Sequence, residues 1–287
     1  MRSALRRAMV AALLFAFVSV GSVSAAPGSS GDHAKLYDVS LGDSLAAGVQ
    51  PIGDPDDLFR TDRGYAEQLL QTARSRYPKL SLEKLGCPGE TTTTMIDGGI
   101  CAYDHGSQLD EAVAFLRGHR QFVAFITIDI GANDFPCQAA ECIPAGVGTI
   151  QSNLPTILAK LRDAAGPGVP IVGMTLYNPF LANWLTGPQG QVIAQASATQ
   201  LMGPVNQVLR GIFVAGGARV ADIEEAFSSN DFATQVDLPG AGTVPLNVAR
   251  ICMWTWVCAP APYGPDNHAN EAGYGAIAHA FAIQLGL

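Results

Sequence analysis

Short hydrophobic runs of strand length recur along the chain, separated by turn residues or polar segments. We expect strands at residues 36–41, 80–85, 122–130, 169–176 and 218–223. Hydrophobic residues at helical spacing predict helices at residues 65–77, 109–116, 150–165, 192–214 and 272–285. Because strands alternate with helices and most strands are nearly all apolar, the pattern predicts an α/β fold in which helices cover both faces of a parallel sheet of about five strands. Such sheets place their sites at the carboxyl ends of the strands.

Two stretches, residues 178–189 and 228–261, follow neither period. Long irregular segments in a compact domain often carry function, so either could shape a substrate cleft, and either could equally be a simple excursion loop. No internal repeat or low-complexity linker divides the chain. We therefore expect a single domain over residues 26–287.

The first residues have the pattern of a secretory signal peptide. Three arginines precede an apolar run at residues 8–18, and small residues follow it. The run is shorter than the roughly 20 residues that a membrane-spanning helix needs. We predict a signal peptide at residues 1–25, cleavage after Ala25 or Ala26, and a secreted, extracytoplasmic product without a stable membrane anchor. A retained N-terminal anchor is the alternative.

The charge of the chain argues against a nucleic-acid partner. The formal net charge is −8, and loss of the leader, with three arginines and no acidic residue, would make it about −11. A strongly acidic protein is repelled by the phosphate backbone. We therefore expect no nucleic acid among the partners.

Six cysteines lie in three local pairs, Cys87 with Cys101, Cys137 with Cys142, and Cys252 with Cys258. An even count in an exported chain indicates disulfides, although six cysteines allow fifteen connectivities. The clustering makes nearest-neighbour bridges our prediction. A zinc site is the rival hypothesis, but no pair has the Cys-x-x-Cys spacing typical of zinc, and the same lack counts against a thiol redox enzyme.

Three short motifs follow the first three predicted strands. The motif GDSL at residues 42–45 places Ser44 in a tight turn with an exposed hydroxyl. In GCPGE at residues 86–90, Gly89 can present a main-chain N–H to a developing oxyanion because no side chain blocks access. In GAND at residues 131–134, Asn133 offers a side-chain N–H donor. Each motif alone is weak evidence, and a plain turn or a helix cap explains it more simply.

A histidine near the C-terminus completes a possible nucleophilic site. His268 lies on a proline-containing loop just ahead of the last predicted helix, from which an imidazole can reach a serine as general base. The other histidines have simpler roles: His33 lies near the mature N-terminus, His105 and His119 lie in polar connectors, and His279 lies within the last helix.

Taken in order, Ser44, Gly89, Asn133 and His268 resemble the four blocks of the SGNH, or GDSL, hydrolase superfamily. The resemblance spans almost the whole mature chain. It implies a three-layer α/β/α, flavodoxin-like fold and an ester hydrolase with Ser44 as nucleophile and His268 as general base. The N–H groups of Ser44 and Gly89 and the Asn133 side chain would form the oxyanion hole, and no metal or organic cofactor would be needed.

One position departs from the pattern of this family. Its members usually carry an aspartate three residues before the histidine, where this chain has Pro265, whereas Asp266 stands two residues before it. The partner that orients His268 is therefore either the Asp266 carboxylate or a main-chain carbonyl such as that of Pro265, an arrangement that other members use. We expect Asp43 to bind backbone amides rather than to act as an acid or base.

We predict an exported, monomeric serine ester hydrolase, esterase-like or lipase-like, that acts on a small-molecule, lipid or carbohydrate ester. The motifs do not encode the alcohol, so removal of O-acetyl groups from a polysaccharide is an alternative. In that case Trp184, Trp254 and Trp256 could stack on sugars, although they could equally be core or acyl-pocket residues. A non-catalytic exported binding protein on a hydrolase scaffold is the alternative from another class.

Each predicted cysteine bridge borders one of the catalytic blocks. Cys87 lies two residues before Gly89, Cys137 follows Asn133 closely, and Cys258 precedes His268. We hypothesise that the bridges hold the loops that position the oxyanion donors and the base, since a displacement of about 1 Å can cost on the order of 10²-fold in rate. General stabilisation of an exported chain is the simpler interpretation.

Overall fold

The computed structural model describes residues 35–135 and 142–287, which fall within one compact unit, Gly31–Leu287. The predicted leader and its cleavage site at Ala25 or Ala26 lie outside the described residues. Five parallel strands form the central sheet in the order β2-β1-β3-β4-β5. They are β1 (Tyr37–Gly42), β2 (Ser81–Lys84), β3 (Val123–Asp129), β4 (Ile171–Met174) and β5 (Arg219–Ala221). All five strands predicted from the hydrophobic runs are confirmed.

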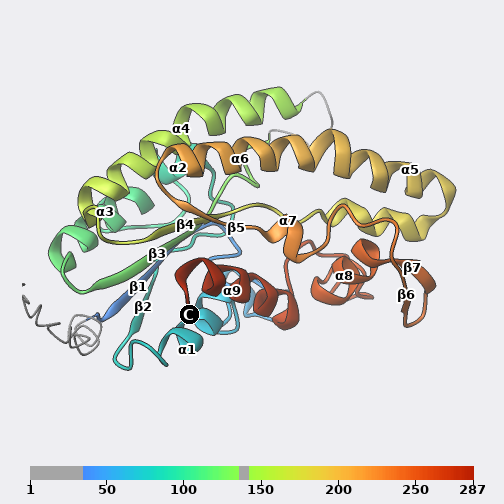
Figure 1. Ribbon diagram of the computed structural model, residues 1–287, viewed down its shortest axis with the longest axis horizontal. Coiled ribbons are helices and arrows are strands. Elements are labelled where there is room, and N and C mark those ends of the chain that lie inside the picture. The colour runs from blue at the N-terminus through green and yellow to red at the C-terminus, as the bar shows by residue number, and fades with distance from the viewer. Residues whose placement is uncertain (1–34, 136–141) are drawn as a thin grey trace, which may run out of the picture. The chain divides into compact units, whose positions relative to one another are not determined.

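Helices cover both faces of this sheet and make it the middle of three layers (Figure 1). One layer holds α2 (Thr92–Asp97), α3 (Gln108–His119), α4 (Ile143–Ala165) and α6 (Gly203–Ala215), and the other holds α1 (Tyr65–Ala73) and α9 (Glu271–Leu285). Every residue of β3 is buried, because this strand has neighbours on both edges and helices on both faces. The predicted α/β/α fold is confirmed.

The helix predicted at residues 192–214 is divided in the structure. It consists of α5 (Pro188–Ala196), a wider π-helical segment (Ser197–Met202) and α6. Pro204 stands in the first turn of α6 and has no N–H to donate to the preceding turn, so the regular ladder is interrupted there. The spacing of hydrophobic residues alone does not reveal this interruption.

The stretch at residues 228–261 is more regular than the sequence indicated. It follows the short helix α7 (Ile223–Ala226) and contains an antiparallel hairpin of β6 (Gln235–Leu238) and β7 (Gly242–Pro245), followed by α8 (Leu246–Trp254). The hairpin and α8 share a small hydrophobic cluster formed by Leu238, Val244, Val248 and Ala249. A nine-residue helix shows too few turns to reveal its period, so tertiary packing decides this segment.

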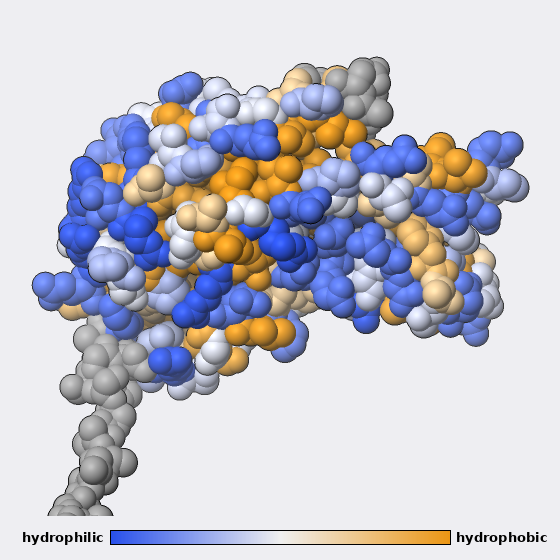
Figure 2. Space-filling view, turned by 45° about the horizontal axis from the view of Figure 1, so that its top comes forward, coloured by the Kyte–Doolittle hydropathy of each residue, from blue (hydrophilic) through white to orange (hydrophobic). Residues whose placement is uncertain are grey.

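The stretch at residues 178–189 forms a 3-10 segment, η4 (Pro179–Thr186), and the start of α5, on which η4 packs. A second short 3-10 segment, η2 (Pro55–Asp57), precedes α1. On α5, Val192 and Ile193 are 66% and 50% exposed. Figure 2 shows hydrophobic residues at the surface of the end of the molecule that carries this helix. α5 therefore presents apolar side chains at the surface.

Candidate active site

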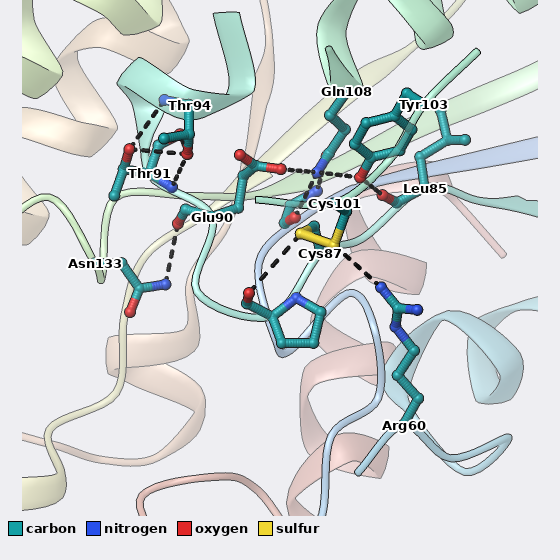
Figure 3. Close-up of a disulfide and its surroundings, with 12 residues drawn as sticks. Arg60, Leu85, Cys87, Glu90, Thr91, Thr94, Cys101, Tyr103, Gln108 and Asn133 are labelled. Carbon is teal, nitrogen blue, oxygen red and sulfur yellow. Dashed lines mark hydrogen bonds between the residues drawn. A yellow bond between two sulfur atoms is a disulfide. The ribbon is translucent and has the colours of Figure 1, made fainter. Parts of the chain in front are cut away.

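The predicted site residues follow neighbouring strands of the sheet. Ser44 lies two residues after the end of β1, which lies between β2 and β3, so the loops that carry Gly89 and Asn133 flank it. Ser44, Asn133 and His268 line one pocket of about 360 Å³. The Gly89 loop is tied to this pocket because Asn133 Nδ2 donates to the main-chain oxygen of Glu90 at 3.0 Å (Figure 3). Segments far apart in the sequence thus meet at the carboxyl ends of the strands.

The turn that holds Ser44 depends on a close approach between β1 and β3. Gly42 has φ 142°, and a Cβ at this position would collide with the main-chain oxygen of Asp129. After Gly42 the chain makes one tight turn, in which Val49 N–H donates to the Ser44 carbonyl at 2.9 Å. Ser44 is half-buried, and its hydroxyl lies 3.5 Å from Asp43 Oδ1. The required glycine thus stands two residues before the residue that carries the hydroxyl.

Asp43 is buried beneath this turn and accepts hydrogen bonds from it. Its Oδ1 accepts from Leu45 N–H at 3.0 Å, and its Oδ2 lies 3.4 Å from Asn133 Nδ2. Burial raises the pKa of Asp43, while hydrogen bonds with Asp129 and from Leu45 act in the opposite direction. These contacts match the amide-binding role expected for Asp43.

Asp129, at the end of β3, lies beside Asp43 although 86 residues separate them in sequence. Burial raises the pKa of Asp129 well above its usual range, and the charge of Asp43 raises it further. Tyr65 donates to Asp129 Oδ1 at 2.7 Å. The charge of Asp43 thus disfavours ionisation of Asp129, because two buried carboxyls in contact cannot both ionise at modest cost.

The loop after β2 carries Gly89 with φ 84°, a left-handed conformation that favours glycine. A Cβ there would meet nothing within 4 Å, so backbone conformation rather than space calls for glycine. The loop begins at Cys87, whose N–H donates to the Gly42 carbonyl at 3.0 Å and which forms a disulfide with Cys101. The loop is therefore attached to the end of β1 just before Ser44.

Asp266 holds the imidazole of His268. Its Oδ1 accepts from the ring Nδ1 at 2.8 Å and from the His268 main-chain N–H at 2.9 Å. Burial raises the pKa of Asp266, but the hydrogen bonds and charge of His268 outweigh it and leave that pKa below its ordinary value. Of the two orienting partners that the sequence left open, the structure places the carboxylate at the ring, although it stands two rather than three residues before the histidine.

The segment around His268 is paired with the chain between Cys252 and Cys258, which form a disulfide. Trp256 N–H donates to the His268 carbonyl at 3.0 Å, and Asp266 N–H donates to the Trp256 carbonyl at 3.2 Å. Trp256, which bonds the His268 loop, thus lies within the segment that this disulfide closes.

A tyrosine that follows β4 holds the same loop from the sheet. The Tyr177 hydroxyl donates to the main-chain oxygen of Asn267 at 2.6 Å, next to His268. Burial raises the pKa of Tyr177 far above its usual range, so it remains a neutral donor. The loop that carries the imidazole is thus attached to the sheet as well as to the disulfide-bonded segment.

The rest of the pocket wall is largely apolar. It consists of Leu45, Phe135, Ile143, Leu176, Tyr177, Pro179, Phe180, Leu201 and Met202. None of the three tryptophans is among the described residues that line it: Trp184 packs on Phe232, and Trp254 packs on Phe227. The stretch after β4 that the sequence left unassigned supplies two of these wall residues, Pro179 and Phe180.

The sequence profile described as the GDSL-like lipase/acylhydrolase family matches residues 40–276, a span that includes Ser44 and His268. The chain belongs to this family. By that membership it is a hydrolase of acyl esters.

Solved structures support the same fold. An acetylxylan esterase from Geobacillus stearothermophilus is similar over 89% of this chain and 97% of its own, with a TM-score of 0.52 and 13% identity. A lipase/acylhydrolase from Enterococcus faecalis is similar over 87% of this chain and 95% of its own, with a TM-score of 0.50 and 15% identity. The comparison with curated protein sequences finds no match.

Two buried residues of this GDSL-family site were missed in the sequence. Glu90 follows Gly89 directly, and burial raises its pKa while hydrogen bonds from Thr94 and Gln108 lower it. Gln108, the first residue of α3, bonds both Gly42 and Glu90. Glu90 could have been suspected because it adjoins a motif, whereas nothing in the sequence near Gln108 points to the site.

The expected third disulfide stays a prediction, because Cys137 lies outside the described residues. Among the residues that are described, no group of three or more His, Cys, Asp or Glu side chains is placed to hold a metal ion. Over the same residues, no helix combines the length and apolar character needed to cross a membrane.

Proposed function

We propose that the protein is an exported serine ester hydrolase that cleaves acyl esters through an acyl-enzyme on Ser44. The observation that carries the proposal is the pocket shared by Ser44, Asn133 and His268, with Asp266 on the far side of the imidazole. Two catalytic mutants of the Geobacillus acetylxylan esterase replace a serine and a histidine by alanine, which supports this pair of residue types in the same fold.

In the proposed reaction, His268 takes the hydroxyl proton of Ser44 on Nε2 as Oγ attacks the ester carbonyl carbon. Asp266 keeps Nδ1 protonated and stabilises the imidazolium that forms. The tetrahedral intermediate collapses when His268 gives the proton to the leaving alkoxide, and the alcohol departs. Water then attacks the acyl-enzyme with His268 again as base, which releases the acid and restores Ser44. Catalytic hydrogen bonds are often long in a free enzyme and tighten when substrate binds.

The negative oxygen of each intermediate would lie among three donors: the main-chain N–H groups of Ser44 and Gly89 and the side chain of Asn133. One Asn133 N–H donates to the Glu90 carbonyl at 3.0 Å, which orients the amide, and Asp43 Oδ2 lies 3.4 Å from the same nitrogen. We propose that the second N–H exchanges this long contact for the oxyanion when substrate binds. Loss of one such donor typically costs about 10²- to 10³-fold in rate.

The apolar wall favours an acyl chain over an acetyl group alone. Phe180 and Met202 belong to this wall, and burial of each CH₂ contributes about 0.8 kcal/mol. Esters with an acyl chain of several carbons should therefore bind better than acetate esters. A polysaccharide O-acetylesterase is the second candidate, supported by the acetylxylan esterases among the similar structures.

A comparison of substrates separates these candidates. We expect kcat/KM on p-nitrophenyl esters to rise from acetate to butyrate or beyond, and to exceed the rate of acetate release from acetylated xylan. A maximum at acetate, together with efficient deacetylation of xylan, would favour the carbohydrate substrate. Export is tested separately by sequencing the N-terminus of the secreted protein, which should begin after Ala25 or Ala26.

The nucleophile is tested with Ser44→Ala, and the exposed helical serine Ser152 provides the matched control. On p-nitrophenyl butyrate we expect Ser44→Ala to lose on the order of 10⁴-fold or more in kcat, and Ser152→Ala to match wild type. Equal rates for Ser44→Ala and wild type would remove Ser44 from the nucleophile role. Lack of ester hydrolysis by wild type on every ester tried would favour the non-catalytic binding protein.

A further inference from the structure

At the end of β1, a side chain bonds both main-chain polar groups of Gly42. Gly42 N–H donates to Gln108 Oε1 at 2.7 Å, and Gln108 Nε2 donates to the Gly42 carbonyl at 2.9 Å. Gln108 is fully buried. Its amide thus makes the pair of bonds that the opposite residue of an antiparallel strand would make, two residues before Ser44.

The same amide also reaches the loop that carries Gly89. Gln108 Nε2 lies 2.8 Å from Glu90 Oε2 and 3.2 Å from the Tyr103 hydroxyl, which itself donates to the Leu85 carbonyl at 2.6 Å (Figure 3). Leu85 and Glu90 lie on either side of the Gly89 turn. Gln108 therefore joins both ends of this loop to the end of β1.

Glu90 bonds both Gln108 and Asn133, the third proposed oxyanion donor. Its side chain accepts from Gln108, and its main-chain oxygen accepts from Asn133 Nδ2 at 3.0 Å. Glu90 is almost completely buried, so a lost partner would not be replaced readily by solvent. One chain of hydrogen bonds thus runs from the main chain before Ser44, through Gln108 and Glu90, to Asn133.

We propose that Gln108 and Glu90 are the positioning pair of the oxyanion hole, and that they fix the Ser44 turn, the Gly89 loop and the Asn133 amide relative to one another. The inference rests on the proposed function. Neither residue touches the substrate. Their effect is on the placement of donors, where an error of about 1 Å can cost on the order of 10²-fold in rate.

The fold contains a matched control for the structural part of this role. Asn247, in the first turn of α8, is also a fully buried amide: its Nδ2 donates to the Ser229 carbonyl at 3.1 Å, and its Oδ1 accepts from Val248 N–H at 2.8 Å. Neither Asn247 nor the two residues that it bonds lines the pocket.

The test compares Gln108→Met with Asn247→Leu in the full-length protein. Each change removes a buried amide that bonds the main chain, so we expect similar losses in Tm. Gln108→Met should lower kcat on p-nitrophenyl butyrate about 10- to 100-fold with KM within about 3-fold, whereas Asn247→Leu should keep kcat within about 3-fold. The Ki of an alkyl trifluoromethyl ketone, whose serine adduct carries an oxyanion, should rise with Gln108→Met in parallel with the loss of kcat/KM.

Glu90→Met provides an independent variant should Gln108→Met fail to fold. It should show the same kcat loss and the same weakening of the ketone, and the double variant should lose little more than either single variant because both act through one connection. Equal kcat losses in the Gln108 and Asn247 variants at equal Tm, or full kcat in a folded Gln108→Met or Glu90→Met protein, would overturn the inference. Failure of the proposed function is distinct, because it would appear as full activity of Ser44→Ala.

Discussion

The pair of Asp266 and His268 gives the sharpest test of the proposed mechanism. Asp266→Asn keeps the size of the side chain and an oxygen that can accept from the His268 main-chain N–H, which now donates to Oδ1 at 2.9 Å. The substitution removes the negative charge beside the imidazole. We therefore expect the fold to persist and the stabilisation of the imidazolium in the transition state to decrease.

The magnitude follows from the geometry of the pair. Two unit charges about 4 Å apart attract by about 1 kcal/mol in water and by about 4 kcal/mol near a protein surface. The side chains of His268 and Asp266 are 27% and 32% exposed, so solvent screens part of the attraction, and about 2 kcal/mol is an intermediate value. Since about 1.4 kcal/mol corresponds to a factor of ten, kcat should fall about 30-fold.

The assay is kcat and KM on p-nitrophenyl butyrate, with Tm measured on the same samples. Asp54→Asn is the matched control, because Asp54 makes the same bond to the main-chain N–H two residues later, at 2.9 Å, but lies on the exposed segment before η2 and holds no histidine. Its kcat should equal that of wild type. An Asp266→Asn enzyme with wild-type kcat would refute the role of the carboxylate and would favour a main-chain carbonyl, such as that of Pro265, as the orienting group.

Two further predictions concern the disulfide beside His268 and a buried carboxyl in β1. Replacement of Cys252 and Cys258 by serine should lower kcat about 10-fold below the unfolding temperature, because the segment that holds the His268 loop is released; activity that persists until global unfolding would leave this disulfide only a stabilising role. Asp38 is fully buried, neither of its carboxyl oxygens has a hydrogen-bond partner within the described part of the chain, and burial raises its pKa well above the ordinary value of about 3.9. The folded chain therefore binds the proton more tightly than the unfolded chain, and this residue lowers stability progressively as pH rises above about 4. Asp38→Asn should thus match wild type in Tm near pH 4 and exceed it increasingly toward pH 8, and a difference in Tm that does not change with pH would contradict this assignment.

Much of the fold follows from local patterns in the sequence. All five strands of the central sheet were predicted, because a buried parallel strand requires a nearly unbroken apolar run whatever its neighbours are. The motifs around Ser44, Gly89 and Asn133 could be placed at strand ends for the same reason. Segments that lack such a run were not recognised: α2 begins with three threonines, and its capping box between Thr91 and Thr94 defines its start.

The connections between the motifs were decided by tertiary structure. Asp43 meets Asp129 only because β1 and β3 are neighbours in register, with Gly42 opposite Asp129. Gln108 reaches Gly42 across 66 residues of sequence, and no local pattern distinguishes it from any other polar residue at a helix start. Such contacts depend on strand order and on how each helix packs, neither of which is encoded in a short window of sequence.

The partner of His268 separates what the sequence determined from what tertiary structure decided. The sequence by itself placed a histidine before the last helix and left open whether Asp266 or a carbonyl near it bonds the ring. Only the folded loop shows which group makes that bond, because its pairing with Trp256 turns the Asp266 carboxylate toward both the ring Nδ1 and the main-chain N–H of His268. A hydrogen bond requires both distance and direction, and sequence spacing supplies neither until the chain has folded.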